Sequence, residues 1–498
     1  MTESTSVHST KGPWQRWLTP TCLTLYAACC LLLWAALDWQ PEWDGSVYLL
    51  LARSMAAGDG YLYQGEAFYL RPPGLSWLLS FMVDDGAIDS HRVNQLLMFF
   101  AATSVLAIYL ATRDLHGRYC ALAVALLSGT SLLFSQLFNS VFAEFPFVTL
   151  ALLAIAALER SVRAKDRWWA WAIVGGLALA TAILMRTVGV LLLPGVVLVP
   201  LVRCRGRARW RGILPAVLIC MVTLPWWQHS RAVAAKVEVP VEQDLLYNYS
   251  TALFRVDPGD PTSDRVDLDG WIERVSSNGA NLMRDLTEAT LHVDAGPMLQ
   301  LGLILALALG VVCAVRRRGL TLLEWLGIVY VPLIATYFVY DKRLVMPLVP
   351  LSYLYLASAI GCLATGALAA ERARRLGAVL VLGMLIVNVV ALSRELEGRT
   401  HVGDVNEQIA QGVLDHTPPD ARILCNQAPT VALMTGRRTF TYRFVRSADI
   451  LAKYEIDYVL YDTPGTPPPL KRMVDERQIE RWAIPFGRGR STQLTRIR

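Results

Sequence analysis

Long apolar segments recur along this chain, and arginine-rich links separate them. The chain has 498 residues, of which 54% are hydrophobic and 18% charged, and its mean hydropathy is +0.38. A run of about 20 apolar residues is long enough to span a bilayer as a helix. This composition excludes an ordinary soluble domain, and we predict an all-α polytopic membrane protein with about eleven transmembrane helices. The predicted spans are 18–37, 92–112, 119–138, 144–160, 168–186, 187–203, 211–228, 297–315, 320–340, 343–368 and 375–393.

The distribution of arginine predicts the orientation of the spans. Cytoplasmic loops are enriched in Lys and Arg, and if the N-terminus is cytoplasmic every loop predicted inside is arginine-rich. The net charge of +6 therefore reflects topology and not nucleic-acid binding. The predicted inner loops are 113–118, 159–167, 203–211, 316–319 and 371–375, and the predicted outer segments are 38–91, 139–143, the bend at Arg186, 229–296, 341–343 and the tail after 393.

The ends of the chain complete the predicted domain organisation. Residues 1–17 are expected to be a cytoplasmic tail. The first apolar run lacks a small-residue cleavage site, so we interpret it as a retained signal anchor. The transmembrane domain covers 18–398, and 399–498 forms a small domain outside the membrane, which we expect to be a bacterial inner membrane. Cys425 alone faces outward, so the cysteines predict no disulfide framework.

Two outer loops contain short structural signals. A helix is expected over 44–57, and the apolar run 72–83 is too short to span, so it should be interfacial or re-entrant. Arg71 directly precedes the Pro-Pro pair that opens this run. In the second loop, acidic residues cluster at 257–270. Their spacing does not match the EF-hand pattern, and a solvated acidic turn is the favoured interpretation over a calcium site.

The tail changes composition and predicts a small α/β domain. Three short β-type runs alternate with helical patterns, which favours parallel strands. The tail contains no phosphate-binding glycine loop and no nucleophile elbow, so packing or acceptor contact is a more plausible role than catalysis. The expected helices are 404–415, 428–434 and 447–454, and the expected strands are 421–425, 439–442 and 457–461.

Five charged residues lie where outer segments meet spans. Two are acidic, Asp44 and Glu144, and three are basic, Arg71, Arg186 and Arg343. A carboxylate at the edge of a bilayer is costly and therefore a candidate for function. Arginine binds phosphate through a planar fork of donors, and a carboxylate beside it can accept a proton from an attacking hydroxyl or amine. These residue types suit glycosyl transfer from a lipid phosphate.

The motifs around these residues resemble the membrane glycosyltransferases of the C-type (GT-C) fold. That family includes protein O-mannosyltransferases, lipid A aminoarabinose transferases and rhizobial core transferases, which use polyprenyl-phosphate sugars. The matching motifs, over about 18–370, are WDGSVYLLLA with Asp44 and Tyr48, RPPGLSWL with Arg71, NSVFAEFPF with Glu144, and DKRLVMPLVPLSYLYLA with Arg343.

The resemblance implies roles for these residues. Asp44 would be the catalytic base or orient the acceptor, and Glu144 would assist it or hold a metal or the acceptor. Arg71 would bind the donor phosphate, and Arg343 would contact phosphate or pyrophosphate. Tyr48 and Arg186 complete the candidate substrate-binding residues. The implied partners are a polyprenyl-phosphate sugar, a lipid, glycan or protein acceptor, and membrane lipid. No cofactor is certain, and participation of a divalent metal stays open.

Each candidate residue also has a simpler interpretation. Asp44 could be an N-cap of the following helix. Glu144 could be an interfacial residue, and Arg343 with its neighbours could be a loop-edge cluster. For Arg186, snorkelling to the headgroups is the favoured interpretation. The histidines show no metal spacing. The alternative functions are a flippase or transporter of polyprenyl-linked glycans, an O-antigen polymerase or ligase, and a scaffold.

Overall fold

The protein is described by a computed structural model. The described residues are 19–27, 29, 41, 43–138, 140–236, 252–256, 263–293, 296–367, 370–398, 403–442, 451, 454–461, 474, 476, 478–486 and 490–497.

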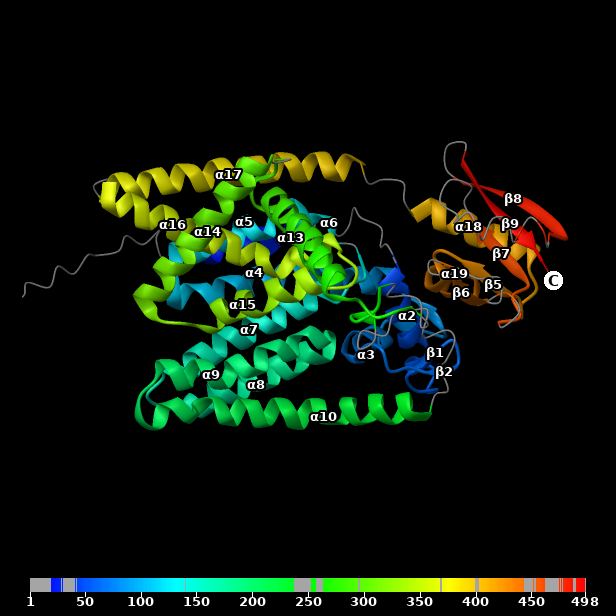
Figure 1. Ribbon diagram of the computed structural model, residues 1–498, viewed down its shortest axis with the longest axis horizontal. Coiled ribbons are helices and arrows are strands. Elements are labelled where there is room, and N and C mark those ends of the chain that lie inside the picture. Colours follow the sequence, from blue (N-terminus) through cyan, green and yellow to red (C-terminus); the bar gives the residue numbers. More distant parts are fainter. Residues whose placement is uncertain are drawn as a thin grey trace, which may run out of the picture.

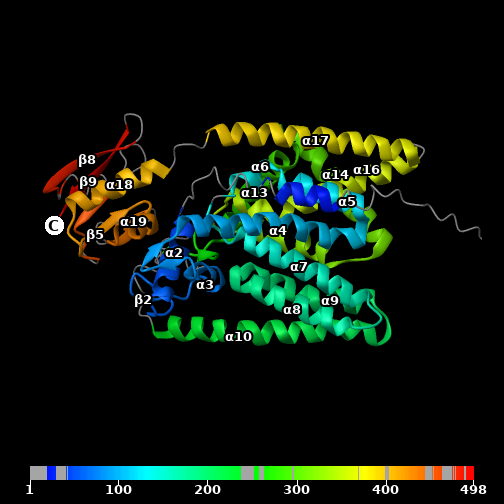
Figure 2. The same ribbon diagram turned by 180° about the vertical axis from the view of Figure 1, so that it is seen from behind.

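The larger part of the molecule is a bundle of long apolar helices (Figure 1). Most of the large buried side chains belong to one hydrophobic core that runs through this bundle. Helices α10 and α17 lie along opposite sides of the bundle in both overall views (Figures 1 and 2). The helices are α4 (Ser90–His116), α5 (Arg118–Gly129), α6 (Leu132–Gln136), α7 (Glu144–Arg163), α8 (Trp168–Met185), η1 (Thr187–Leu192), α9 (Leu193–Arg203), η2 (Gly206–Gly212), α10 (Ile213–Lys236), α14 (Pro297–Arg318), α15 (Leu322–Thr336), η3 (Lys342–Leu348), α16 (Val349–Ala367) and α17 (Ala370–Gly398).

The predicted fold class is confirmed. Within the described residues, seven helices are long and apolar enough to cross a membrane, and three further apolar helices are shorter. The predicted span 119–138 is broken into α5 and α6, because the Ser131 side chain accepts a hydrogen bond from Phe134 N and starts a new helix. Half of the first predicted span, 18–37, lies outside the described residues, and 19–27 are helical.

The arginine-rich loops lie together at one end of the bundle, here called the far end. Arg163 Nη1 donates to the Asp114 carbonyl, and Arg211 Nη1 donates to the Ala164 carbonyl at 2.6 Å. Arg318 Nη1 reaches the Leu115 carbonyl. The links predicted to share one face of the membrane therefore contact one another.

The opposite end, here called the domain-side end, carries the short elements of the first loop. Helix α2 (Trp43–Ala56) confirms the predicted helix over 44–57, and α3 (Gly74–Ser80) lies within the short apolar run 72–83. The hairpins are β1 (Leu62–Tyr63) with β2 (Glu66–Ala67), and β3 (Val83–Asp84) with β4 (Ala87–Ile88).

Helix α13 (Leu268–Leu291) covers much of the second loop, where no helix was predicted. One of the acidic residues at its start has a structural role: the Asp267 side chain caps α13 by accepting a hydrogen bond from Gly270 N. Residues 257–262, the first half of the predicted acidic turn, lie outside the described residues.

The C-terminal domain packs helices against a five-stranded sheet of order β6-β5-β7-β9-β8. The predicted parallel strands are present, since β5 (Arg422–Cys425) pairs in parallel with β6 (Arg438–Thr441) and β7 (Tyr458–Tyr461). Two strands were not predicted, and they add antiparallel pairs: β8 (Glu480–Phe486) and β9 (Arg490–Arg496). Helices α18 (Gly403–His416) and α19 (Ala428–Thr435) match predictions, whereas helix 447–454 falls mostly outside the described residues.

Candidate active site

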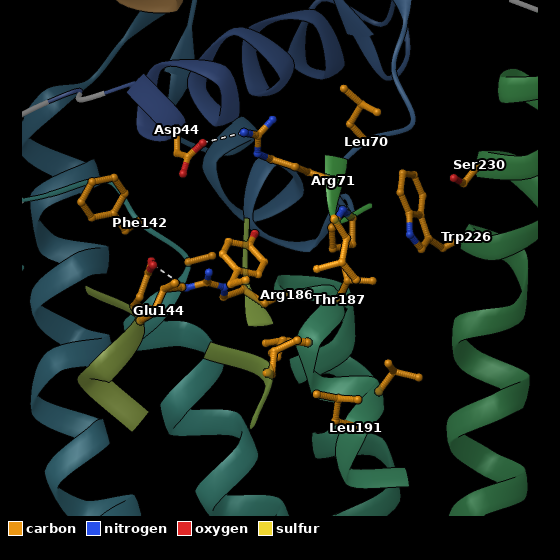
Figure 3. Close-up of a pocket in the computed structure, with 18 of the residues that line it drawn as sticks. Asp44, Leu70, Arg71, Phe142, Glu144, Arg186, Thr187, Leu191, Trp226 and Ser230 are labelled. Atoms are coloured by element: carbon orange, nitrogen blue, oxygen red, sulfur yellow. Dashed lines mark hydrogen bonds and ion pairs between the residues drawn. The ribbon is translucent and has the colours of Figure 1, made fainter. Parts of the chain in front are cut away.

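A cavity of about 670 Å³ opens at the domain-side end of the bundle. All six residues singled out from the sequence line it, although they come from segments far apart in the chain. Figure 3 shows acidic and basic side chains of the lining in contact, with dashed lines joining Asp44 to Arg71 and Glu144 to Arg186. These residues are Asp44, Tyr48, Arg71, Glu144, Arg186 and Arg343.

Asp44 lies in the first turn of α2 between two arginines. Arg71 Nη2 donates to Asp44 Oδ1 at 2.6 Å, and Arg343 Nη2 donates to the other oxygen, Oδ2. The side chain of Arg71 is only 4% exposed, whereas that of Asp44 is 15% exposed toward the cavity. Because α2 begins one residue before Asp44 and both carboxylate oxygens bind arginine, helix capping does not account for this residue.

Glu144 forms a second ion-paired site at the start of α7. Its side chain is 3% exposed and pairs with Arg186. Arg343 Nε lies 3.6 Å from Glu144 Oε1, so Arg343 connects the two carboxylates. Arg343 also lies over the Phe142 ring, 4.4 Å from its centroid. Arg186 therefore faces a buried carboxylate, in place of the snorkelling that we favoured from the sequence.

The segment that carries Arg71 is fixed by contacts on both sides. The Tyr61 hydroxyl donates to the carbonyl of Arg71 at 3.1 Å, and Ser230 of α10 donates to the carbonyl of Tyr69. Gly74, which opens α3, packs so closely on α8 that a Cβ there would lie 2.6 Å from the Leu184 carbonyl oxygen. Arg71 is thus presented from a rigid turn.

Helix α13 fixes the segment that carries Arg343. Asn278 Nδ2 donates to the Tyr337 carbonyl at 2.6 Å, and the Tyr340 hydroxyl donates to Asp285 at 2.8 Å. Asp341 caps η3 through the backbone N–H of Arg343 and also pairs with its guanidinium. Helix α13, which the sequence analysis did not predict, therefore fixes the segment that precedes Arg343.

The surroundings of Asp44 oppose its protonation. Burial alone would raise the pKa of this carboxyl, but the charges of Arg343 and Arg71 outweigh it and hold the pKa well below the usual range. Asp44 is therefore ionised across the physiological range of pH. In this arrangement it is also a weak base, because both of its oxygens are bound to arginine.

The remaining wall of the cavity is largely apolar and aromatic, and the sequence did not identify its residues. Trp226 of α10 is 7% exposed and meets Tyr61 edge to face, with ring centroids 5.8 Å apart. Aromatic residues near span ends are common at membrane interfaces, so their pattern did not distinguish this wall. The apolar and aromatic residues of the wall include Tyr69, Val188, Val190, Leu191, Trp226, Trp227, Leu333, Ile334, Tyr337 and Phe338.

The side chains of the cavity do not fit a resident divalent cation. Such an ion needs several oxygen ligands, and here the carboxylates of Asp44 and Glu144 are both engaged by guanidinium groups. Within the described residues, no three His, Cys, Asp or Glu side chains gather in a way that could hold a metal. The acidic loop likewise gives no calcium site among its described residues.

Comparisons with known proteins agree with this architecture. Residues 70–229 match the family model of dolichyl-phosphate-mannose-protein mannosyltransferase. No curated protein sequence matches the chain significantly. Among solved structures, ArnT from Cupriavidus metallidurans is 16% identical with a TM-score of 0.60, over 96% of this chain and 98% of that one. A second structure of that protein is bound to undecaprenyl phosphate, with a TM-score of 0.55, 16% identity and coverage of 95% and 97%.

The oligosaccharyltransferase AglB from Archaeoglobus fulgidus, in complex with an inhibitory peptide and a dolichol-phosphate, is 12% identical. Its TM-score is 0.61, over 90% of this chain and 70% of that chain. Another structure of the archaeal protein is a complex with zinc and sulfate, at 14% identity. The resemblance inferred from the sequence motifs is therefore confirmed: this chain has the GT-C fold of membrane glycosyltransferases, and its residues 70–229 are related to a mannosyltransferase family.

Proposed function

We propose that this protein is a membrane glycosyltransferase that moves a sugar from a polyprenyl-phosphate donor to a lipid, glycan or protein acceptor. The observation that carries this proposal is the position of Asp44. Its carboxylate lies between Arg71 and Arg343 at the rim of a cavity whose remaining wall is largely apolar and aromatic. A base, a phosphate site and a surface for a lipid chain thus meet in one place.

The charge balance of the cavity favours an anionic ligand. Four arginines and two carboxylates line the cavity, which gives two excess positive charges when all six groups are ionised. Asp341, which pairs with Arg343 from outside the lining, offsets one of them. Guanidinium groups donate in pairs to phosphate oxygens. Arg71 and Arg343 would bind the donor phosphate, and Arg186 would add charge from the base of the cavity.

The apolar wall supplies a surface for the prenyl chain. Val190, Leu191 and Ile334 lie on this wall, and Trp226 bounds it on the side of α10. A prenyl chain that enters from the bilayer gains no hydrophobic free energy here, because lipid tails are as apolar as these residues, so the wall would hold the chain by van der Waals packing. Structures of similar fold that bind undecaprenyl phosphate or dolichol-phosphate support a donor of this class.

The reaction would be a displacement at the sugar. An acceptor hydroxyl or amine attacks the anomeric carbon, and the bond from that carbon to the phosphate oxygen breaks. The electron pair leaves with the phosphate, whose charge the arginines stabilise. The proton of the acceptor passes to Asp44.

Donor binding would also activate the base. A phosphate that binds Arg71 and Arg343 competes with Asp44 for the same donors. Each hydrogen bond lost to the carboxylate raises its pKa toward the usual range. Asp44 would thus become an effective base only when the donor is present.

Glu144 is assigned a supporting role. It pairs with Arg186 and approaches Arg343, so it holds two of the phosphate-binding arginines in the cavity. Tyr48 lines the cavity one turn after Asp44. The acceptor would enter from the domain-side end, which we place on the extracytoplasmic face because the arginine-rich loops lie at the far end. This assignment puts the N-terminus inside and the C-terminal domain outside the inner membrane.

A deletion strain tests the proposal. Mass spectrometry of its cell-envelope glycans should show the loss of one sugar, which wild-type protein restores and the Asp44→Asn variant does not. Immunoblots of membrane fractions must show equal amounts of the two proteins. If Asp44→Asn restores the sugar, the assignment of Asp44 is wrong; if the deletion only leaves a lipid-linked glycan on the inner leaflet, the protein is a transporter.

A further inference from the structure

The C-terminal domain contacts the helix that carries Asp44. Helix α19 lies beside α2 in both overall views (Figures 1 and 2). Ser46 Oγ and Thr430 Oγ1 lie 2.9 Å apart, and both hydroxyls also reach the carbonyl of Pro41. Ser46 is fully buried and Thr430 is 4% exposed. These bonds lie in the first turn of α2, two residues after Asp44.

The contact continues along both helices. Arg53 Nη2, in the last turn of α2, donates to the Leu433 carbonyl at 3.2 Å. The Leu433 side chain is buried in the hydrophobic core of the transmembrane bundle together with Leu49 and Ala52 of α2. The C-terminal domain therefore shares a core with the bundle.

A second contact joins the hairpin after α2 to the edge of the C-terminal sheet. Thr439 N donates to Gln64 Oε1 at 2.9 Å, and Gln64 Nε2 donates to the Thr439 carbonyl at 3.1 Å. Thr439 lies on β6, which is an edge strand of the sheet. Gln64 has a φ of 50°, which is uncommon for a residue with a side chain. The side-chain amide of Gln64 thus binds the backbone N–H and carbonyl of Thr439, as a neighbouring strand would do.

A second side of α2 packs closely against Val141, in the segment that precedes Glu144. A Cβ on Gly45 would lie 2.7 Å from the Val141 carbonyl oxygen. Glycine at this position lets the two backbones approach, and the following residues of that segment are Phe142 and Glu144, which line the cavity. The first turn of α2 is therefore held between the segment before α7 on one side and α19 on the other.

We propose that the C-terminal domain sets the position of Asp44, with Thr430 and Gln64 as positioning residues. This inference rests on the proposed function, because it assigns the domain a role in the same active site. Asp44 must lie within hydrogen-bond reach of the acceptor proton, and a shift of about 1 Å in a reacting group can lower turnover about 10²-fold. A domain without catalytic motifs would then contribute to the rate through geometry.

Two substitutions weaken the contacts without altering residues of the cavity. Thr430→Val removes the hydroxyl and keeps the shape of the side chain. Gln64→Gly removes both amide bonds and suits the positive φ of the hairpin, so the turn itself should persist. Thr430→Ser retains a hydroxyl and serves as the conservative variant. Thr492→Val is the matched control, because the Thr492 hydroxyl donates to the Tyr461 carbonyl inside the same domain, in the sheet and away from α2.

Kinetics and hydrogen exchange of the full-length protein test the proposal. We expect kcat to fall about tenfold in Thr430→Val and further in the double variant with Gln64→Gly, with little change in the KM for the donor. Thr430→Ser and Thr492→Val should keep the wild-type kcat. Amides of 43–56 should exchange faster in Thr430→Val and Gln64→Gly, and at the wild-type rate in Thr492→Val.

The two readouts separate this inference from the proposed function. Wild-type kcat and wild-type exchange over 43–56 in the double variant would overturn the positioning role. Equal losses of kcat in Thr430→Val and Thr492→Val would also overturn it, because they indicate general destabilisation of the domain. Suppose that wild-type protein transfers no sugar, while amides of 43–56 exchange faster in Thr430→Val but not in Thr492→Val. The contact between α19 and α2 is then supported, and the proposed function is wrong.

Discussion

Two clusters of buried charge lie at opposite ends of the bundle, and they have the same composition. The cavity cluster consists of Asp44 and Glu144 with Arg71, Arg186 and Arg343. The far-end cluster consists of Glu159 and Glu324 with Arg163, Arg203 and Arg318. Each has two largely buried carboxylates and three arginines, so the number of these groups does not distinguish the clusters; the exposed Asp341 also pairs with Arg343 at the edge of the cavity cluster.

The two clusters differ in how their carboxylates are satisfied. Glu159 accepts from Arg203 at 2.7 Å and from the backbone N–H of Leu322 at 3.0 Å. Glu324 accepts from Thr321 N, Arg318 and the Tyr355 hydroxyl, and it completes a capping box at the start of α15. These bonds join the start of α15 to α7 and α16. The far-end carboxylates thus have a structural role.

In the cavity cluster the bonds to Asp44 come from arginine side chains that a phosphate could engage instead. The cluster also borders a cavity of about 670 Å³. A buried carboxylate that binds a backbone N–H as well as side chains joins segments of the fold, whereas one held by arginine side chains beside a cavity can take part in chemistry. The comparison predicts that substitution of Asp44 lowers turnover per folded molecule, whereas the equivalent substitution of Glu159 lowers stability and leaves turnover per folded molecule nearly unchanged.

The largest expected difference concerns the carboxylates. Asp44→Asn should lower turnover about 10³-fold, because it removes the general base. Turnover can be measured in liposomes with a panel of undecaprenyl-phosphate-linked sugars. Asp44→Asn should also lower the melting temperature, because Arg71 and Arg343 lose their counter-charge, so turnover is compared per folded molecule.

Glu159→Gln is the matched variant at the far end. It leaves buried arginines without their counter-charge, so we expect about 3 kcal/mol of lost stability. Turnover per folded molecule should stay within about twofold of wild type, since this site is remote from the cavity. A loss of turnover in Glu159→Gln comparable to that in Asp44→Asn would remove the distinction between the two clusters.

The next effect concerns the arginines. Arg343→Lys should weaken donor binding about tenfold, because lysine lacks the planar fork of donors with which Arg343 would bind the phosphate. Arg318→Lys should leave donor affinity unchanged. Binding of a fluorescent polyprenyl phosphate measures both, and equal affinities in the two variants would refute the phosphate-binding role of Arg343.

The smallest effect is a dependence of stability on pH. The pKa of Asp44 is held below its ordinary value of 3.8 in the folded protein by Arg343 and Arg71, although burial alone would raise it. A carboxyl with a lowered folded pKa stabilises the fold above its unfolded pKa, and this contribution is lost as pH falls through the folded pKa. The difference in melting temperature between wild type and Asp44→Asn should therefore be constant from neutral pH to about 4 and narrow only below. A difference that disappears between pH 7 and 5 would contradict the ion pairing.

The sequence predicted much of this architecture because hydrophobicity dominates in a membrane. Apolar length located the long helices from α4 to α17 except α13, and arginine content grouped the loops of the far end. The locations of Asp44, Arg71, Glu144 and Arg343 were predicted from charge at span ends and from short motifs. Each of these signals is local in the chain.

The rest depends on contacts between distant segments. Asp44 and Arg343 are 299 residues apart, and no local pattern pairs them. Arg186 was assigned to the headgroups because its partner Glu144 lies on another helix. Helix α13 was missed because its polar face hid an apolar face that includes Leu282 and Leu286, which pack into the bundle core. The contact of Thr430 with Ser46 likewise follows only from the docking of the C-terminal domain.

The most direct test of the central claim is the affinity of purified Asp44→Asn protein for undecaprenyl phosphate. We propose that the carboxylate and the phosphate compete for Arg71 and Arg343. The variant should therefore bind undecaprenyl phosphate at least as tightly as wild type, even though it no longer transfers sugar. Weaker binding by Asp44→Asn would contradict the account, because Asp44 would then serve to hold the arginines and not to accept the proton.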